Sequence, residues 1–406
     1  MFKKEIAPRA LDRENLWVST WLAFALLPLA GFATDIYIPS LPSMSNALGV
    51  GSIEVQFTLT VFLISYGVSQ LFVGSILDSF GRHRIGIFSL IVFALASIAI
   101  AESHHIWTIY LMRALQGVTA GAVVVAKRAY FVDVFTGEKL KHYLSLFSII
   151  WSLGPIIAPF LGGYLQAWSG WESNFYFLAI LALIFAVLEY FFNGESLGKF
   201  APFHLKSIVG VYRSMLATGS FIMGVLIIGI SYAMVMVFNM TGAFIIEHHF
   251  HFTPITAGYS ALILGFAWMV GGLIGKATLR YPFFLKLKIN LAVQVFIGLL
   301  MWFSSQWVEN LYSLVAFAYM VHVTAGFAFN IYFTYCLGIF PKNAGIASGL
   351  TGGLMYIFVS FFSYSIVYLI PAKDQLNLSY SYLILIAMAL TVLLFVFKRD
   401  RRAALE

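Results

Sequence analysis

The stretch WVSTWLAFALLPLAGFATDIYIPSLP, residues 17–42, is almost entirely apolar and carries one acid, Asp35, near its end. A run of this length exceeds the apolar core of a signal peptide and is sufficient to cross a bilayer. A charged side chain inside a membrane-spanning helix costs about 2.5–3.5 kcal/mol on insertion scales. The stretch therefore predicts a membrane-spanning helix whose carboxylate has a function.

The rest of the chain has the same apolar character. Hydrophobic residues make up 61% of the 406 residues and charged residues 10%, against about 45–50% and about 25% in average soluble domains. This composition predicts an all-α integral membrane protein. The single cysteine, Cys336, lies in an apolar run, so no disulfide framework is expected.

Apolar runs of membrane-spanning length recur twelve times along the chain. We expect spans at 17–38, 53–77, 86–102, 106–129, 143–166, 174–193, 217–240, 256–276, 289–305, 311–336, 346–369 and 379–397. The polar stretch NGESLGKFAPFHLKS (193–207) divides them into two sets of six. The pattern predicts two pseudo-symmetric six-helix bundles, 1–193 with an N-terminal arm and 216–406 with a basic tail, joined by a linker at 194–215.

The basic residues fix the expected orientation. If the N-terminus is cytoplasmic, 22 of the 24 lysines and arginines fall on the cytoplasmic side of this topology. Lys373 falls on the other side, and Arg113 lies inside a span. By the positive-inside rule both termini are expected in the cytoplasm. The net charge of +7 then reflects orientation in the lipid bilayer, and no nucleic-acid partner is expected.

Three motifs in the first half carry a family resemblance. The loop GSILDSFGRHR (74–84) combines two glycines that permit close packing and a tight turn with an acid and several bases that can form ion pairs. RALQG (113–117) lies in the fourth span, and GPIIAPFLGG (154–163) lies in the fifth. Together they resemble the signature loop, the second motif and the antiporter motif of the major facilitator superfamily.

Each of these motifs also has a plainer interpretation. The loop at 74–84 is compatible with an ordinary positively charged inner loop. In the antiporter motif, Pro155 and Pro159 remove backbone donors and kink a helix, while Gly154, Gly162 and Gly163 permit close packing. A structural hinge without a ligand accounts for the same residues, and the two interpretations are compatible.

Two further stretches narrow the resemblance. TDIYIPSLP (34–42) and KRAYFVDVF (127–135) resemble signatures of the Bcr/CflA group of drug/proton antiporters. The resemblance implies alternating access between two bundles, with a small-molecule substrate, protons as partners and energy source, and no cofactor. It implies a cytoplasmic latch formed by Gly74, Asp78, Gly81, Arg82 and Asp133. The loop GKATLRYPFFLK (275–286) departs from the repeated signature, because it lacks the corresponding aspartate and second glycine.

Asp35 and Arg113 are the predicted proton-coupling pair. Asp35 lies four residues from the expected end of its span, about 6 Å deep, and Arg113 lies about 10 Å deep in the fourth span. The resemblance places both spans at the central cavity. Burial disfavours a charged carboxylate and a nearby guanidinium favours it, so small changes in access could switch the proton on Asp35. A structural ion pair, or an aspartate at the interface, are the alternatives.

Other polar groups inside the spans are candidates for the substrate cavity: Tyr37, Tyr66, Gln70, Gln116, Asn239, His322, Asn330, Tyr335, Tyr356 and Tyr364. Each is also compatible with a hydrogen bond between helices. Glu189 is expected at the cytoplasmic interface. The histidines of SHH (103–105) and IEHHFH (246–251) admit a metal or metal-chelate site, but interfacial polar residues are the favoured interpretation, and no metal is expected.

The leading hypothesis is proton-coupled export of a small organic molecule, a drug or metabolite, by a monomer in a bacterial inner membrane. Export or import of a siderophore or another metabolite is an alternative, and a receptor that does not transport is another. No H-E-x-x-H, G-x-S-x-G, Walker or paired C-x-x-C motif is present. An enzyme is therefore not expected.

Overall fold

The computed structural model describes residues 15–200, 205–340, 344–371 and 373–403. Within these ranges every regular element is a helix. Eleven helical segments are long and apolar enough to cross a membrane, and α7 (Gly137–Ser169) is a further long helix that packs among them. The all-α membrane class is confirmed, and the helix count agrees with the twelve spans predicted. The N-terminal arm lies outside the described residues.

The first span is built from several short helices. It consists of α1 (Leu16–Leu26), α2 (Leu29–Asp35), the 3-10 helix η1 (Ile38–Ser40) and α3 (Leu41–Leu48). The breaks fall at prolines, because Pro28 precedes α2 and Pro39 and Pro42 stand at the starts of η1 and α3. Proline lacks the N–H that continues a helix but is tolerated in the first turn of a new one.

This arrangement corrects the sequence prediction that the first span ends at residue 38. The prolines restart the helix instead of ending the span, which continues to Leu48. Asp35 therefore lies about 20 Å along the helix axis from that end. Its distance from the end of the span is thus much greater than the expected depth of about 6 Å.

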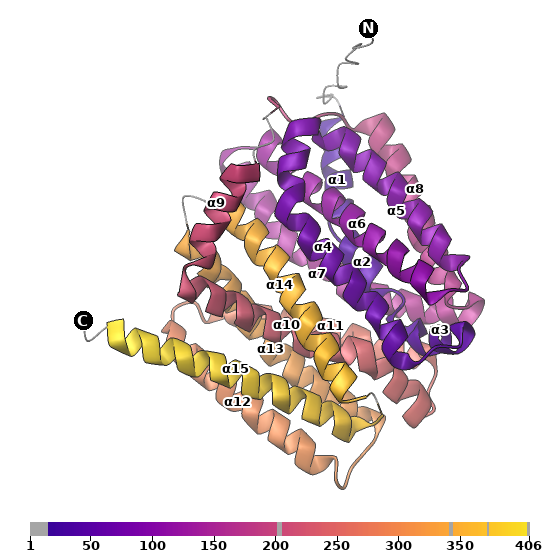
Figure 1. Cartoon of the computed structure of the whole chain (residues 1–406), viewed down its shortest axis with the longest axis vertical. Helices are drawn as coiled ribbons and strands as arrows, with labels where there is room; N and C mark the ends of the chain where they lie inside the picture. Colours follow the sequence, from indigo (N-terminus) through magenta and orange to yellow (C-terminus); the bar gives the residue numbers. More distant parts are fainter. Residues whose placement is uncertain (1–14, 201–204, 341–343, 372, 404–406) are drawn as a thin grey trace.

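The remaining helices of the first half are α4 (Ser52–Phe80), α5 (Arg82–Ala101), α6 (Ile106–Val134), α7 and α8 (Glu172–Phe192). A linker helix, α9 (Leu205–Leu216), leads to the second half. That half contains α10 (Gly219–Phe244) with a π-turn η2 (Ile245–His249), α11 (Pro254–Ala277), α12 (Phe283–Ser304), α13 (Leu311–Ile339), α14 (Ala344–Leu369) and α15 (Gln375–Ala403). Figure 1 shows the indigo-to-magenta helices of the first half beside the orange-to-yellow helices of the second.

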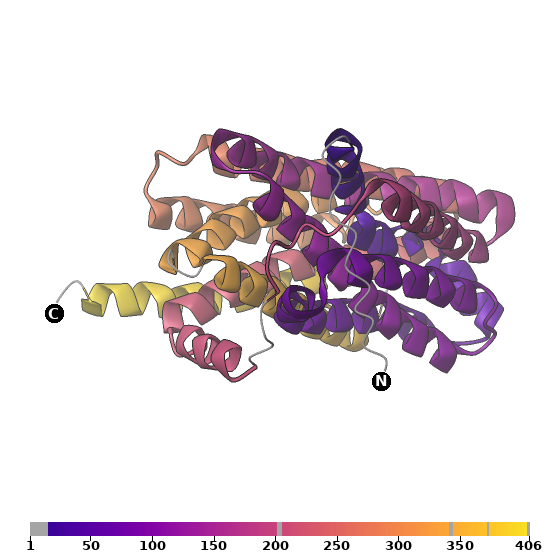
Figure 2. The ribbon, with the colours of Figure 1, turned by 90° about the horizontal axis from the view of Figure 1, so that it is seen from above.

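The helices run between two ends of the molecule, called the linker end and the opposite end. The linker end carries α9 and the connections at residue 81, 135–136 and 193–200, and the opposite end carries the connections at 49–51, 102–105 and 250–253. Figure 2 shows the two halves from above, with the first half mainly on the right and the second mainly on the left.

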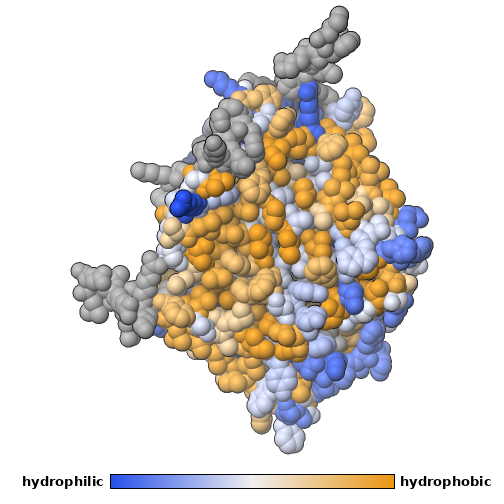
Figure 3. Space-filling view, in the orientation of Figure 1, coloured by the Kyte–Doolittle hydropathy of each residue, from blue (hydrophilic) through white to orange (hydrophobic). Residues whose placement is uncertain are grey.

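The outer surface between the two ends is strongly apolar. Figure 3 shows hydrophobic side chains over the central part of one face, with hydrophilic ones gathered at its margins. Large aromatic side chains stand exposed near both ends, with Trp107 and Trp168 toward the opposite end and Trp17 toward the linker end. Tryptophan prefers the interface between lipid and water, so these side chains mark the two membrane boundaries.

The two halves touch mainly from their middle to the opposite end. There α7 packs against α11, and α4 packs against α14. A Cβ atom added to Gly163 would lie 2.7 Å from Pro254 O, and one added to Gly67 would lie 2.7 Å from Gly353 O. Small residues at such crossings let helix backbones approach closely in membranes. Gln56 Nε2 also donates to Met240 O across the halves at 2.8 Å.

Candidate functional site

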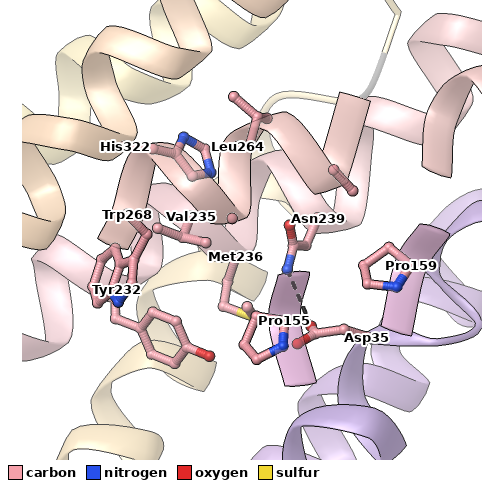
Figure 4. Close-up of a pocket in the computed structure, with 12 residues that line it drawn as sticks. Asp35, Pro155, Pro159, Tyr232, Val235, Met236, Asn239, Leu264, Trp268 and His322 are labelled. Carbon is pink, nitrogen blue, oxygen red and sulfur yellow. Dashed lines mark hydrogen bonds between the residues drawn. The ribbon is translucent and has the colours of Figure 1, made fainter. Parts of the chain in front are cut away.

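A narrow pocket lies between the two halves (Figure 4). Asp35 at the end of α2, with Pro155 and Pro159 of α7, forms the wall on the first half. The other wall is formed by residues of α10, α11 and α13: Tyr232, Val235, Met236, Asn239, Ala261, Leu264, Gly265, Trp268 and His322. A mainly apolar pocket with a few convergent polar groups is typical of a small-molecule site.

Asp35 is the acid in this pocket, and its side chain is buried, with the residue only 1% exposed. Asn239 Nδ2 of α10 donates a hydrogen bond to Asp35 Oδ1 at 3.2 Å, drawn as the dashed line in Figure 4. The other oxygen, Oδ2, has no hydrogen-bond partner among the described residues. Burying an unpaired polar oxygen is unfavourable, so this oxygen is suited to take a proton or a ligand donor.

Arg113 of α6 is buried beside the end of α2 but binds its backbone. Its Nη1 donates to Ala33 O at 2.9 Å and to Gln116 Oε1 at 2.7 Å. The guanidinium lies over the rings of Tyr37 and Phe62, 4.7 Å and 4.4 Å from their centroids. A cation is stabilised both by the carbonyls at a helix C-terminus and by aromatic faces.

The expected ion pair between Asp35 and Arg113 is therefore not formed in this structure. No ion pair joins them among the described residues, and Asn239 is the partner of Asp35 instead. Nη1 of the guanidinium donates instead to Ala33 O and Gln116 Oε1, while Nη2 has no hydrogen-bond partner among the described residues. Arg113 is thus linked to Asp35 through the backbone carbonyl two residues before it.

Two of the ten predicted cavity residues, Asn239 and His322, line the pocket. Several others form hydrogen bonds away from the pocket. Tyr37 Oη pairs with Thr58 Oγ1 at 2.8 Å, and Gln116 Nε2 donates to Ser97 Oγ at 2.7 Å, so both serve contacts between helices of the first half. Asn330 Nδ2 donates to Gly326 O of its own helix at 2.9 Å.

The remaining predicted tyrosines contact other rings. Tyr66 meets Tyr356 edge to face at 4.8 Å between centroids, and Tyr356 in turn lies 6.1 Å from Tyr232 of the pocket. Tyr335 stacks on Phe283, and Tyr364 packs on Phe57. Gln70 lies in α4 beside Gly352 of α14, where the two halves meet. Tyr66, Tyr356 and Gln70 thus belong to the contact between halves and not to the lining of the pocket.

Tyr232, Met236 and Trp268 line the pocket but were not predicted. Tyr232 and Met236 stand one turn apart on α10, and Trp268 of α11 contacts Tyr232 at 5.4 Å between ring centroids. Both helices are apolar on every side, so no periodicity in the sequence distinguishes a pocket face from a lipid face. The one available signal was that Tyr232 and Asn239 are polar groups on a single helix.

The predicted latch residues lie together at the linker end. Arg82 pairs with Asp133, and its Nη2 lies 2.9 Å from Asp78 Oδ1. Gly81 has φ of +95°, a conformation that glycine adopts readily and that makes the tight turn between α4 and α5. An added Cβ on Gly74 would meet no atom within 4 Å, so that glycine makes no close helix approach here.

The linker contributes a latch residue that was not predicted. Glu195 accepts hydrogen bonds from the backbone N–H groups of Arg82 and His83 at 3.1 and 3.2 Å. These are the first N–H groups of α5, and a carboxylate at a helix N-terminus is favourable. The whole latch therefore joins α4, α5, α6 and the start of the linker within the first half.

The antiporter motif on α7 supplies close contacts. An added Cβ on Gly162 would lie 1.6 Å from Ile36 O, directly after Asp35, and one on Gly154 would lie 3.1 Å from Gly31 Cα. Gly163 and the two prolines face α11 and the pocket. The helix continues unbroken past both prolines, so the motif packs α7 on the broken first span.

Glu189 corrects a further expectation. It lies at the linker end of α8 but is buried, 1% exposed, and not at the interface. Lys127 Nζ lies 2.5 Å from Glu189 Oε2, and Asn193 Nδ2 donates to the same oxygen at 2.8 Å. Lys127 is likewise buried inside α6, because each charge neutralises the other.

The histidines at the opposite end are dispersed. His249 Nε2 lies 3.3 Å from Glu309 Oε1, while His248 packs on the ring of Phe244. Within the described parts of the chain, no group of three or more His, Cys, Asp or Glu side chains could hold a metal ion.

Comparison with known proteins gives consistent matches. The model of the family described as Major Facilitator Superfamily matches residues 23–363. The chain is 32% identical over 181 residues, 45% of each chain, to a protein of Haemophilus influenzae named Bicyclomycin resistance protein homolog. It is 27% identical over 339 residues, 81% of this chain and 83% of the relative, to Multidrug resistance protein MdtL of Shewanella sp. (strain ANA-3).

The fold has close structural neighbours. A bacterial homolog of the human lysosomal transporter Spinster superposes with a TM-score of 0.74, covering 96% of this chain and 98% of that chain at 11% identity. At that identity the likeness concerns the fold alone.

Proposed function

This chain belongs to the major facilitator superfamily, and we propose that it is a proton-coupled exporter of small organic molecules. The observation that carries the proposal is the buried Asp35, which has an unpartnered oxygen at a pocket between the two halves. The names of its relatives, which refer to bicyclomycin and multidrug resistance, support export of such molecules. The relatives named above do not include a siderophore transporter, so that alternative has no support.

In the proposed mechanism, Asp35 carries the proton. When the pocket opens to the outside, a proton neutralises the carboxylate and weakens its hold on the substrate. When the pocket opens to the cytoplasm, the proton leaves and the carboxylate binds the next substrate. Arg113 favours the charged form because its guanidinium is nearby and anchors Ala33 O, two residues before Asp35.

The two halves supply the alternating access. We take them as two six-helix bundles, residues 1–193 and 216–406, that rock about the pocket. In the present structure they are joined at the opposite end, through α7 with α11 and α4 with α14. The latch around Arg82 is confined to the first half and the linker. These contacts fit a state that is closed outside and opens to the linker end.

The linker end is the cytoplasmic side in this proposal. The exposed Lys139, Lys141 and Arg213 lie there, and basic residues favour the cytoplasmic side. We accordingly place the protein in a bacterial inner membrane as a monomer, with both termini in the cytoplasm.

A transport assay tests the proposed function. The purified full chain is reconstituted in proteoliposomes, and a panel of labelled drugs is offered with and without an imposed pH gradient. We expect accumulation of at least one compound that depends on the gradient and collapses with a protonophore. Uptake that is indifferent to the gradient, or binding without transport, would contradict the proposal.

A further inference from the structure

His322 of α13 has a hydrogen-bonding state fixed by its own helix. Its Nδ1 lies 2.7 Å from Ala318 O. A carbonyl oxygen only accepts, so Nδ1 must carry the hydrogen of the neutral ring. Nε2 is then a lone-pair acceptor. The ring is also held edge-on by Phe238, 5.9 Å away between centroids, so the acceptor has a fixed direction.

This acceptor has no partner in the protein. The residue is 1% exposed, lines the pocket, and its Nε2 makes no hydrogen bond among the described residues. In Figure 4, His322 and Asp35 lie on opposite sides of the drawn residues, with Met236 between them. Two residues that line the pocket therefore carry buried acceptors without a partner among the described residues, Asp35 Oδ2 and His322 Nε2.

We propose that His322 is a specificity-determining residue whose Nε2 accepts a hydrogen bond from an N–H or O–H group of the substrate. The substrate class that fits both acceptors is an apolar organic cation with a hydrogen-bond donor distant from its charge. The charge lies toward Asp35 on the first half, and the donor reaches His322 on the second. This inference rests on the proposed function, because it assigns the same pocket to the exported molecule.

Such a ligand would also bridge the two halves. Asp35 belongs to α2 and His322 to α13, and the pocket walls between them come from both halves. A site built to hydrogen-bond a substrate donor discriminates strongly against an analogue that lacks it, because its buried acceptor is then left unpaired.

Two substitutions separate recognition from packing. In His322→Asn the shorter amide can still donate toward Ala318 O but does not reach the position of Nε2. In His322→Gln the longer amide places an acceptor near that position. Ala318 O remains within helix α13 in both variants, so both are expected to fold.

Two cationic probes provide the readout. Ethidium carries amino donors on its aromatic rings, whereas tetraphenylphosphonium has no N–H or O–H group. Binding of each to the purified full chain is measured by fluorescence for ethidium and by equilibrium dialysis for tetraphenylphosphonium. We expect His322→Asn to weaken ethidium binding about tenfold, the size of one hydrogen bond, and His322→Gln to restore most of it. Tetraphenylphosphonium binding should be unchanged in both variants.

The other outcomes contradict the inference. Equal weakening of both probes would mean that His322 only shapes the pocket, and unchanged ethidium binding would mean that Nε2 contacts no substrate. A parent protein that binds neither probe would exclude the substrate class. Transport of tetraphenylphosphonium driven by a pH gradient in the parent protein keeps the tests separate, because it supports the proposed function whatever the His322 variants do to ethidium binding.

Discussion

Among the described residues, the carboxylate of Asp35 forms one hydrogen bond, with Asn239. This bond joins the two halves. Asn239→Ala removes it without altering the acid. A hydrogen bond to a charged group contributes about 1.5–3 kcal/mol net. If the bond exists only when the opposite end is closed, its loss should shift the ratio of closed to open molecules by about 10- to 150-fold.

Distances between spin labels measure this ratio. Cysteines at His104 and Lys373 place one label on each half at the opposite end, where both residues are exposed. The native Cys336 is buried and should remain unlabelled. Asn330→Ala is the matched control, because Asn330 donates to Gly326 O of its own helix. We expect long distances to gain population in Asn239→Ala and not in Asn330→Ala.

The effect should also depend on pH. Protonation of Asp35 turns the bond into an ordinary neutral one, which contributes about 0.5–1.5 kcal/mol. The difference in the ratio of closed to open molecules between the parent and Asn239→Ala should therefore shrink when the pH is lowered far enough to protonate Asp35. An unchanged distance distribution in Asn239→Ala, or an equal shift in Asn330→Ala, would show that this hydrogen bond does not hold the opposite end closed.

Three further predictions concern stability and topology. Lys127→Met leaves Glu189 buried without its cation and should lower the free energy of unfolding by about 3–5 kcal/mol. Thermal unfolding measures this loss, and the double variant Lys127→Met with Glu189→Gln should recover part of it. Gly162→Ala places a Cβ 1.6 Å from Ile36 O, so it should lower the melting temperature or abolish folding. Gly86→Ala is the control, because an added Cβ there meets no atom within 4 Å. Equal melting curves for the two variants would contradict the close contact. A cysteine at His104 should react with an impermeant maleimide in intact cells and one at Lys139 only after permeabilisation, and the reverse pattern would invert the proposed topology.

The apolar runs were sufficient to predict the class and the helix pattern, because each span must be long and apolar to cross the bilayer. They could not predict where the first span ends. Pro39 and Pro42 follow shortly after the predicted end at residue 38, yet each stands in the first turn of a new helix. Whether proline ends or restarts a helix depends on the packing around it, which here includes Gly162 of α7 against Ile36 O.

The polar residues inside the spans could be recognised as functional candidates, but their partners could not. Asp35 and Arg113 were expected to interact because they are an acid and a base at comparable depth inside two spans. In the fold, Arg113 binds carbonyls and aromatic faces, and Asp35 binds an amide from the other half. Backbone carbonyls are invisible as partners in a sequence, and contacts between halves depend on the conformational state.

The role of Asp35 as proton carrier is tested most directly by measuring proton movement driven by substrate in Asp35→Asn. Proteoliposomes containing a pH-sensitive dye are given an outward or inward gradient of a transported compound, and Asp374→Asn, a change of acid to amide at a helix start far from the pocket, serves as control. We expect the parent and Asp374→Asn to move protons in the direction opposite to the substrate, whereas folded Asp35→Asn binds substrate and moves none. Parental proton movement by Asp35→Asn would exclude Asp35 as the proton carrier.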